Sequence, residues 1–264
     1  MPLPVLHACG TLVGWLTFLL SPTYRRRFLE NARQAGFSFA AVRPAIAESG
    51  KLVMETPRIW FGAPAPAQWA GGEIVRASLA SGRGILFLTP HLGCFEVAAQ
   101  AVARDWGPIT VLYRRARKAW LRELVDTARE RDNLSAAPTT LAGVKQLLKA
   151  LKAGQIVALL PDQVPPRGQG VWAPFFGKPA YTMTLSARLA RQTNAIVLLA
   201  RSERLPSGRG YVIHIREWTG PLEGNGEAAA AQINARMEAM IRECPQQYLW
   251  GYARYKNPRE ELAL

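Results

Sequence analysis

Short apolar runs alternate with longer amphipathic runs over the last two thirds of the chain. The short runs predict buried strands at Ile85–Leu88, Ile109–Tyr113, Gln155–Leu160, Ile196–Arg201 and Tyr211–Arg216. The longer runs predict helices over Glu73–Ala80, Phe95–Asp105, Trp120–Arg131, Leu141–Lys152, Tyr181–Gln192 and Glu227–Glu243. Strands that are apolar throughout and alternate with helices indicate an α/β fold, with a mostly parallel central sheet flanked by helices.

The N-terminal stretch is apolar and carries no Asp, Glu, Lys or Arg over residues 1–24. Leu3–Leu20 predicts a hydrophobic helix, slightly short for a bilayer span of roughly 20 residues, and a basic cluster at Arg25–Arg27 follows it. No basic n-region precedes the run, which argues against a signal peptide. We expect a membrane anchor that spans the bilayer or lies in its interface, with the remaining chain in the cytoplasm. The alternative is a buried first helix of the globular domain.

The segment between this anchor and the alternating region has its own pattern. Basic and apolar positions alternate over Arg26–Gly50, which predicts a pair of amphipathic helices interrupted near Gly36 and Pro44. Thr56–Gly72 is rich in Pro, Gly, Ala and Trp and predicts an irregular connection. The chain therefore divides into residues 1–24, an anchor or interfacial helix, residues 25–72, a helical and irregular segment, and residues 73–264, an α/β domain.

The net charge of +14 implies an acidic partner. Nucleic acid, an anionic membrane surface and an acidic carrier protein all satisfy that requirement, although no nucleic-acid-binding motif is present. The three cysteines are widely spaced, which predicts neither a disulfide framework nor a zinc site and fits a reducing compartment.

Candidate chemistry begins directly after the strand Ile85–Leu88. His91 lies in the predicted turn, and Glu96 opens the following helix. Positions five apart on one straight helix are about 140° apart, so His91 has to precede the helix for the two side chains to meet. In that arrangement Glu96 accepts the Nδ1–H of His91 and leaves Nε2 as a base. An unrelated surface histidine beside a glutamate is the alternative.

Polar residues also follow later strands. Arg114 comes after Ile109–Tyr113, and Asp162 comes after Gln155–Leu160. Because parallel strands end at one edge of a sheet, we expect both to converge with His91 there. Arg114 could bind a phosphate or stabilise an oxyanion. The loop Gly168–Pro179 carries aromatic side chains and suits an apolar ligand such as an acyl chain, or else folds onto the core.

Cys94 lies three residues after His91 and admits two interpretations. It is either a small packed residue or a nucleophile activated by the histidine. The sequence contains no phosphate-binding loop, no G-x-S-x-G elbow and no metal-ligand cluster, so we expect neither a metal nor a cofactor. His91 is the one histidine placed to act as a base.

These motifs together resemble a known family. TPHLGCFE (residues 89–96) resembles the H-x4-[DE] block of lysophospholipid-type acyltransferases. Later segments resemble the subsequent blocks of the lipid A late acyltransferases (lauroyl and myristoyl transferases): Tyr113-Arg114, Asp162-Gln163, VWAPFFGKPA (residues 171–180) and Gln247–Trp250. The resemblance covers roughly residues 84–256. It departs near the end, where Tyr252 and Ala253 stand in place of a histidine and an arginine.

The resemblance implies a glycerolipid acyltransferase-like fold and an enzyme at the cytoplasmic face of the inner membrane. Such an enzyme moves an acyl group from an acyl carrier protein thioester to a hydroxyl of a lipid A precursor, an anionic glycolipid. By this resemblance His91 is the base, Glu96 is its partner and Arg114 contacts the oxyanion or a phosphate. Further oxyanion or substrate contacts are expected at Gly93, Asp162, Gln163, Phe175, Phe176 and Gly177.

Other activities remain compatible with the sequence. The acceptor could be a lysophospholipid, an ornithine lipid or a phosphatidylinositol mannoside, and coenzyme A could replace the carrier protein. A thioesterase or lipase using Cys94 or water would release free fatty acid, and a non-catalytic basic membrane-binding module would not need His91.

Overall fold

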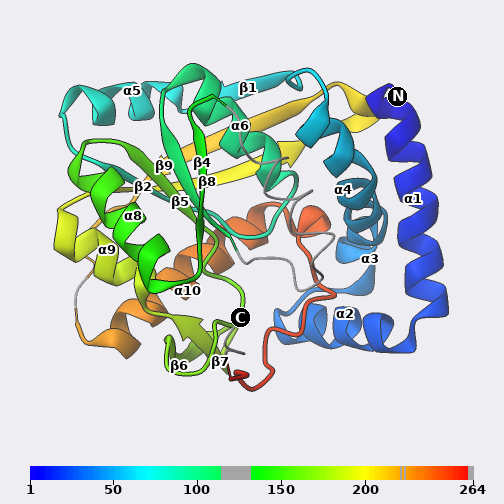
Figure 1. The fold of residues 1–264 in the computed structure, drawn as a ribbon. Helices are drawn as coiled ribbons and strands as arrows, with labels where there is room; N and C mark the ends of the chain where they lie inside the picture. The colour runs from blue at the N-terminus through cyan, green and yellow to red at the C-terminus, as the bar shows by residue number, and fades with distance from the viewer. Residues whose placement is uncertain (114–131, 221, 223, 261–264) are drawn as a thin grey trace.

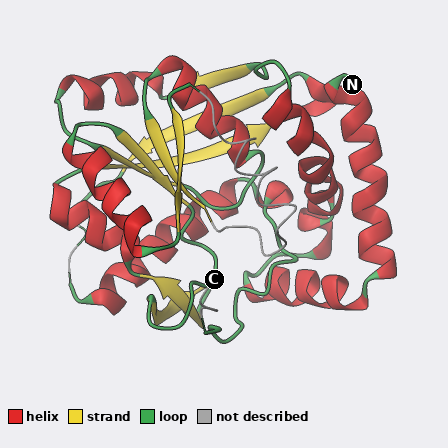
Figure 2. Cartoon of the chain, in the orientation of Figure 1, coloured by secondary structure: helices red, strands yellow, loops and turns green. Residues whose placement is uncertain are grey.

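A seven-stranded sheet forms the centre of the computed structural model, which describes residues 1–113, 132–220, 222 and 224–260 (Figures 1 and 2). The strands lie in the order β1-β9-β8-β2-β5-β3-β4. In chain order they are β1 (Ala67–Ala70), β2 (Ile85–Leu88), β3 (Ile109–Tyr113), β4 (Leu134–Pro138), β5 (Ile156–Leu159), β8 (Ile196–Arg204) and β9 (Tyr211–Glu217).

The sheet is mostly parallel, as the alternating pattern predicted. Strands β8, β2, β5, β3 and β4 all run in one direction. Strand β9 is antiparallel to β8, and β1 is parallel to β9 at the sheet edge. The C-terminal ends of the five parallel strands therefore share one rim of the sheet, and β2 lies near the middle of it.

Helices cover both faces of the sheet (Figure 2). Residues Ile85 and Phe87 of β2 pack in a core with α5 (Gly72–Ala80) and α6 (Phe95–Asp105). Leu86 and Leu88 point the other way, into a core beneath three helices: α8 (Leu141–Lys152), α9 (Leu185–Thr193) and α10 (Gly226–Glu243). Burial on both faces explains why the strand has no polar positions.

The structure differs from the predicted elements at several places. Strand β4 was not predicted, because Leu134–Pro138 lacks a strong apolar run. The expected loop Gly168–Pro179 is instead largely a hairpin of β6 (Gly170–Phe175) and β7 (Lys178–Met183), so α9 begins later than predicted. Two short 3-10 turns, Pro206–Gly208 and Pro245–Gln247, complete the assignment. The helix predicted at residues 120–131 lies outside the described residues.

Four helices stand beside the sheet at the N-terminal end of the chain (Figure 1). They are α1 (Leu3–Leu20), α2 (Pro22–Gln34), α3 (Phe39–Val42) and α4 (Pro44–Phe61). The irregular connection expected over residues 56–72 is limited mainly to residues 62–66, since α4 continues to Phe61 and β1 then pairs with β9. The division of the chain at residues 24 and 72 stays a prediction.

Helices α1 and α4 pack in close backbone contact. A Cβ atom on Gly14 would lie 2.1 Å from the carbonyl oxygen of Ile46, and one on Gly50 would lie 2.0 Å from that of Gly10. Only glycine fits at such distances, so the spacing of Gly10 and Gly14 by four residues on α1 is a packing device. Helix α1 is therefore docked on the rest of the chain along one side.

Candidate active site

His91 and Asp162 meet at the C-terminal ends of two neighbouring strands. His91 follows β2, Asp162 follows β5, and the two strands pair in parallel. The Nδ1 atom of His91 lies 2.7 Å from Oδ1 of Asp162, and the backbone N–H of His91 donates to Oδ2 at 2.9 Å. One carboxylate therefore holds both the ring and the backbone of His91, and it leaves Nε2 for other contacts.

The carboxylate of Asp162 is buried and charged. Burial by itself raises its pKa, but the opposing charge of His91, the bonds from the His91 ring and backbone, and the charge of Arg254 outweigh burial and leave the pKa below its ordinary value. An ionised carboxylate on Nδ1 selects the tautomer that carries its proton on Nδ1. Nε2 of the neutral ring is then the basic nitrogen.

Glu96 does not occupy the position that the sequence analysis assigned to it. The prediction placed Glu96 on Nδ1 of His91, and the structure places Asp162 there. The carboxylate of Glu96, in the first turn of α6, accepts a hydrogen bond from the Trp60 indole at 3.1 Å. The spacing rule considered only residues near His91 along the chain, whereas sheet pairing brings Asp162 from the next strand. Glu96 nevertheless borders the same pocket as His91.

The turn after His91 is fixed by its backbone. Gly93 has a φ of +61°, and a Cβ atom there would lie 1.7 Å from the carbonyl oxygen of Ser202, so the position requires glycine. Its N–H donates to the carbonyl of Gln247 at 2.9 Å, and the Cys94 N–H donates to that of Ser202 at 3.1 Å. The prediction that the Gly93 N–H serves as an oxyanion donor therefore conflicts with the structure, which already pairs that group.

An apolar pocket of about 210 Å³ opens beside His91, between α6 and the sheet. His91, Glu96, Phe95 and Thr89 belong to its lining at the strand ends. Further residues from α6 and from six strands make the remaining wall, among them Phe87, Ala98, Ala99, Val102, Ile109, Val111, Leu134, Ala158, Ala200, Ile213 and Ile215. An imidazole at the edge of an apolar cavity suits a ligand that joins a reactive polar group to a hydrocarbon chain.

The aromatic residues predicted to line this site lie elsewhere. Phe175 and Phe176 are buried near the β6–β7 turn, where their rings approach Arg254 and Trp250 respectively. Gly177 completes that turn with a φ of +73°. The structure thus supports the alternative in which this segment folds onto the core. Gln163 follows Asp162 and is half-buried, and Arg114 lies outside the described residues.

Cys94 is poorly suited to act as a nucleophile. Its side chain is fully buried, and burial together with the negative charge of Glu55 raises the pKa of the thiol well above its ordinary value. A nucleophilic cysteine needs a lowered pKa and access to substrate. The interpretation of Cys94 as a packed residue agrees with this geometry.

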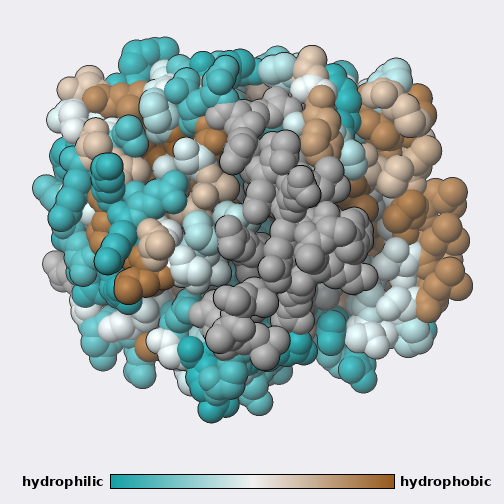
Figure 3. Space-filling view, in the orientation of Figure 1, coloured by the Kyte–Doolittle hydropathy of each residue, from teal (hydrophilic) through white to brown (hydrophobic). Residues whose placement is uncertain are grey.

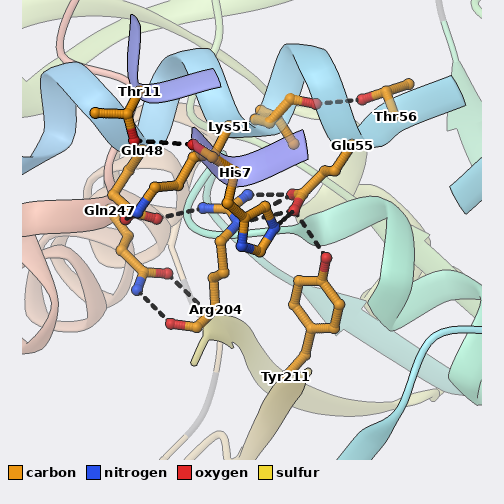
Figure 4. Close-up of polar contacts among 10 residues, drawn as sticks. His7, Thr11, Glu48, Lys51, Glu55, Thr56, Arg204, Tyr211 and Gln247 are labelled. Atoms are coloured by element: carbon orange, nitrogen blue, oxygen red, sulfur yellow. Dashed lines mark hydrogen bonds and ion pairs between the residues drawn. The ribbon is translucent and has the colours of Figure 1, made fainter. Parts of the chain in front are cut away.

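A buried ionic network joins α1, α4, β8 and β9 (Figure 4). The guanidinium of Arg204 on β8 binds the carboxylate of Glu55 on α4, which also accepts bonds from His7 on α1 (2.8 Å) and from the Tyr211 hydroxyl (2.7 Å). Arg204 exchanges two backbone bonds, each of 2.8 Å, with the side-chain amide of Gln247. Since the Gln247 carbonyl holds Gly93, the network connects α1 to the turn that carries His91.

Sequence reasoning missed this network. The sequence analysis assigned no role to His7, although a histidine in an apolar segment is a signal for a buried polar partner. No sequence pattern marked Glu55 as a buried, paired carboxylate, because its partners come from three other elements. Burial raises the pKa of Glu55, but its bonds from Arg204, His7 and Tyr211 outweigh burial and lower the pKa to about 2.

The side of α1 that faces away from α4 is apolar and exposed. Exposed side chains on this helix include Val5, Leu12, Leu16, Leu19 and Leu20. Figure 3 shows hydrophobic side chains gathered along the edge of the molecule over α1. Among the described helices, α1 has the length and apolar character of a membrane span. No group of three His, Cys, Asp or Glu side chains suited to a metal ion occurs within the described residues.

Known proteins match the chain over nearly its whole length. The family model for the bacterial lipid A biosynthesis acyltransferases matches residues 1–257. The lipid A biosynthesis lauroyltransferase of Escherichia coli (strain K12) is 31% identical over 80% of this chain and 70% of its own length. The palmitoleoyltransferase of the same organism is 26% identical over 97% and 87%. A lipid A biosynthesis acyltransferase of Haemophilus influenzae is 24% identical over 99% and 87%.

Proposed function

The chain belongs to the bacterial lipid A biosynthesis acyltransferases, and from this premise we propose that it transfers a fatty acyl group from an acyl carrier protein thioester to a hydroxyl of a lipid A precursor. The observation that carries the proposal is the His91–Asp162 pair at the edge of an apolar pocket. The pair supplies a base, and the pocket suits the acyl chain.

In the proposed reaction, Nε2 of His91 removes the proton from the acceptor hydroxyl as its oxygen attacks the thioester carbonyl carbon. Asp162 holds the Nδ1–H and stabilises the imidazolium that forms. The tetrahedral intermediate then collapses, the C–S bond breaks, and the imidazolium returns its proton to the leaving thiolate. The products are an ester and a free thiol, and His91 is again neutral. General-base assistance of this kind contributes about 10²–10⁴-fold.

Glu96 keeps a supporting role in this proposal. Its carboxylate borders the same pocket and is held by the Trp60 indole. A second negative charge at this pocket helps to stabilise the imidazolium that forms during the reaction. The original assignment of Glu96 as partner of His91 is thus retained in electrostatic form, with the contact to Nδ1 given to Asp162.

The developing oxyanion needs donors other than Gly93, whose N–H is engaged. Helix α6 begins at Phe95, and the N–H groups of a first helical turn have no intrahelical partner. The positive end of the α6 dipole therefore lies beside His91 and favours negative charge there. Arg114, which directly follows β3, is the proposed side-chain donor.

The donor and the membrane account for the remaining features. An acidic carrier protein is attracted by a chain of net charge +14. The exposed apolar side of α1 and the arginines at the start of α2 suit the surface of an anionic membrane. We place the enzyme at the cytoplasmic face of the inner membrane, with α1 in contact with lipid.

An acyl-transfer assay tests the proposal directly. Purified enzyme in mixed micelles receives acyl carrier protein thioesters of several chain lengths and a radiolabelled tetra-acylated lipid A precursor, with His91→Ala as control. We expect wild type to give a labelled product with one additional acyl chain, and we expect His91→Ala to give no such product. Free fatty acid as the sole product would favour a thioesterase, and product from a lysophospholipid alone would assign another acceptor.

A further inference from the structure

A second hollow, separate from the acyl pocket, lies between α2, the β6–β7 turn and the C-terminal segment. It has a volume of about 660 Å³. Two side-chain amides of α2 hold its walls together. Asn31 donates to the carbonyls of Trp250 and Tyr252, each at 2.7 Å, and Gln34 donates to that of Phe176 at 2.7 Å. We call this hollow the basic cleft.

The lining of the basic cleft is strongly cationic. It contains Arg26, Arg27 and Arg33 from α2, Lys178 from β7, and Arg254 and Lys256 from the C-terminal segment. Glu30 is the acidic residue in the same lining, and its carboxylate lies 3.9 Å from Arg26 at an exposed position. Six converging cations create a positive potential, which attracts an anion of high charge such as a phosphate.

Arg254 gives further support, because its charge is buried and is compensated only at longer range, by the carboxylate of Asp162. Its guanidinium is 2% exposed and donates only to neutral oxygens, those of Tyr181, Thr182 and Asn234. Within the described residues its Nε has no hydrogen-bond partner, and no carboxylate lies within ion-pair distance. A buried cation without a carboxylate at ion-pair distance costs free energy. A negative charge in the cleft above it would recover part of that cost.

The cleft is close to the active site along the chain. Leu249 donates its backbone N–H to the carbonyl of His91 at 3.3 Å, and Ala253, four residues later, is part of the cleft lining. Four residues of extended chain span at most about 14 Å. Arg254 is also near enough for its charge to lower the pKa of Asp162. A ligand bound in the cleft therefore lies within reach of the reacting groups, and α2 connects it to the apolar side of α1.

We propose that the basic cleft binds a phosphate group on the sugar of the acceptor glycolipid and thereby presents the acceptor hydroxyl to His91. This inference rests on the proposed function and adds the site that recognises the acceptor. The shared chemistry is a phosphate anion, which free phosphate also offers and which anionic phospholipids carry as a phosphodiester.

The test compares two double variants that remove equal charge. Arg27→Ala/Arg33→Ala removes two exposed cations of the cleft. The matched control, Lys152→Ala/Arg188→Ala, removes two exposed cations from α8 and α9, which lie at the left of Figure 1, away from α2 at the lower right. A conservative variant, Arg27→Lys/Arg33→Lys, keeps the charge. Acyl transfer is measured with a phosphorylated precursor and with the same precursor after enzymatic removal of its phosphates.

We expect the cleft variant to raise KM for the phosphorylated acceptor about tenfold or more, because charge-assisted hydrogen bonds are lost. KM for the carrier protein thioester should stay unchanged, the lysine variant should recover most of the loss, and the control should resemble wild type. Wild type should show the same rise in KM with the dephosphorylated acceptor. Equal use of both acceptors by wild type would overturn the cleft proposal and leave the proposed function intact.

Further outcomes show whether the cleft binds the acceptor, the donor or anionic lipid in general. A rise in KM for the carrier protein thioester instead would assign the cleft to the donor and refute the proposal. If wild type transfers an acyl group to neither acceptor, the proposed function fails. The cleft proposal is then tested by measuring binding to lipid vesicles. Phosphatidylcholine vesicles that carry the phosphorylated glycolipid should then bind the His91→Ala protein more tightly than the same protein with Arg27→Ala/Arg33→Ala added. Equal loss of binding to vesicles of phosphatidylglycerol would reduce the cleft to a general basic surface that binds any anionic lipid, and would refute the proposal.

Discussion

The carboxylate of Asp162 contacts His91 twice, through the ring Nδ1 and through the backbone N–H, although the two residues lie 71 positions apart in the sequence. A side chain that binds the backbone and the ring of one residue fixes where that residue lies and how its ring is turned. The direction of the imidazole is therefore set by the neighbouring strand β5 and not by the helix that follows the turn.

The first prediction concerns the pair itself. In Asp162→Asn the amide can still accept a bond from one donor, but it no longer stabilises an imidazolium and it admits the wrong tautomer. We expect kcat for acyl transfer to fall by about 10²–10⁴-fold. Steady-state kinetics with a carrier protein thioester measures the loss, and circular dichroism of the variant checks that the fold is kept.

Glu96→Gln is the comparison that separates the two carboxylates. Because the structure places Asp162 on Nδ1, we expect a smaller loss from Glu96→Gln than from Asp162→Asn. The reverse order would show that Glu96 is the principal partner of His91 during the reaction, as the resemblance implied, and would contradict our assignment.

The second prediction concerns the length of the acyl chain. Val102 on α6 lines the pocket two helical turns beyond Phe95, which is in ring contact with His91. In Val102→Phe the larger ring fills space away from the strand ends, so we expect a preference for acyl donors shorter by several carbons. The ratio of kcat/KM between long and short thioesters is the measurement, because overpacking also costs about 1–3 kcal/mol of stability and lowers both rates.

A control at the same helix distinguishes the pocket from general damage. Arg104→Ala alters an exposed residue of α6 whose partner is its neighbour Asp105. It should leave the chain-length ratio unchanged. An unchanged ratio in Val102→Phe as well would mean that the acyl chain does not enter this pocket.

The position of the polar residues at the strand ends was predictable from the sequence, because it depends on the local pattern of apolar and polar residues. The run Ile85–Leu88 predicted a buried strand, and His91 and Asp162 were both placed on its rim because parallel strands end together. The partner of Nδ1 was not predictable in this way. It depends on which strands are neighbours, and hydrophobic periodicity does not predict a strand order of β8-β2-β5-β3.

The β6–β7 hairpin shows a different limit. Its prolines and glycines resemble a loop, and its aromatic residues suggested a ligand site, but Phe175 and Phe176 are buried in the core. Periodicity does not tell which partner covers an aromatic side chain. The network around Glu55 escaped for a similar reason, since its members come from α1, α4, β8 and β9 and share no sequence spacing.

The third prediction concerns that network. Glu55→Gln leaves the charge of Arg204 with less compensation inside the fold, and breaking a buried ion pair costs about 3–5 kcal/mol. We expect the variant to unfold at a correspondingly lower urea concentration at pH 7, in detergent. Glu30→Gln, at an exposed pair on α2, should unfold like wild type. Equal stability of Glu55→Gln and wild type would contradict the assigned role.

The same network predicts a pH dependence. The pKa of Glu55 is about 2 in the fold, against an ordinary value of 4.5, so the folded state favours the ionised form. Its contribution is complete above pH 4.5 and is lost as the pH falls toward 2. The difference in unfolding free energy between wild type and Glu55→Gln should therefore shrink over that range, as measured by urea titrations at successive pH values.

The last prediction concerns the exposed side of α1. Leu12, Leu16 and Leu19 are exposed, whereas His7, Gly10 and Gly14 of the same helix are buried on the side that packs against α4. Docking of one side by Glu55 and by the glycine contacts leaves the other side for lipid. Burying a leucine side chain contributes about 1.5–3 kcal/mol, so Leu12→Ser/Leu16→Ser should reduce sedimentation with phosphatidylglycerol vesicles by more than tenfold. Leu141→Ser, at an equally exposed apolar residue of α8, should bind like wild type. Undiminished binding of the double variant would show that this side of α1 does not contact the membrane.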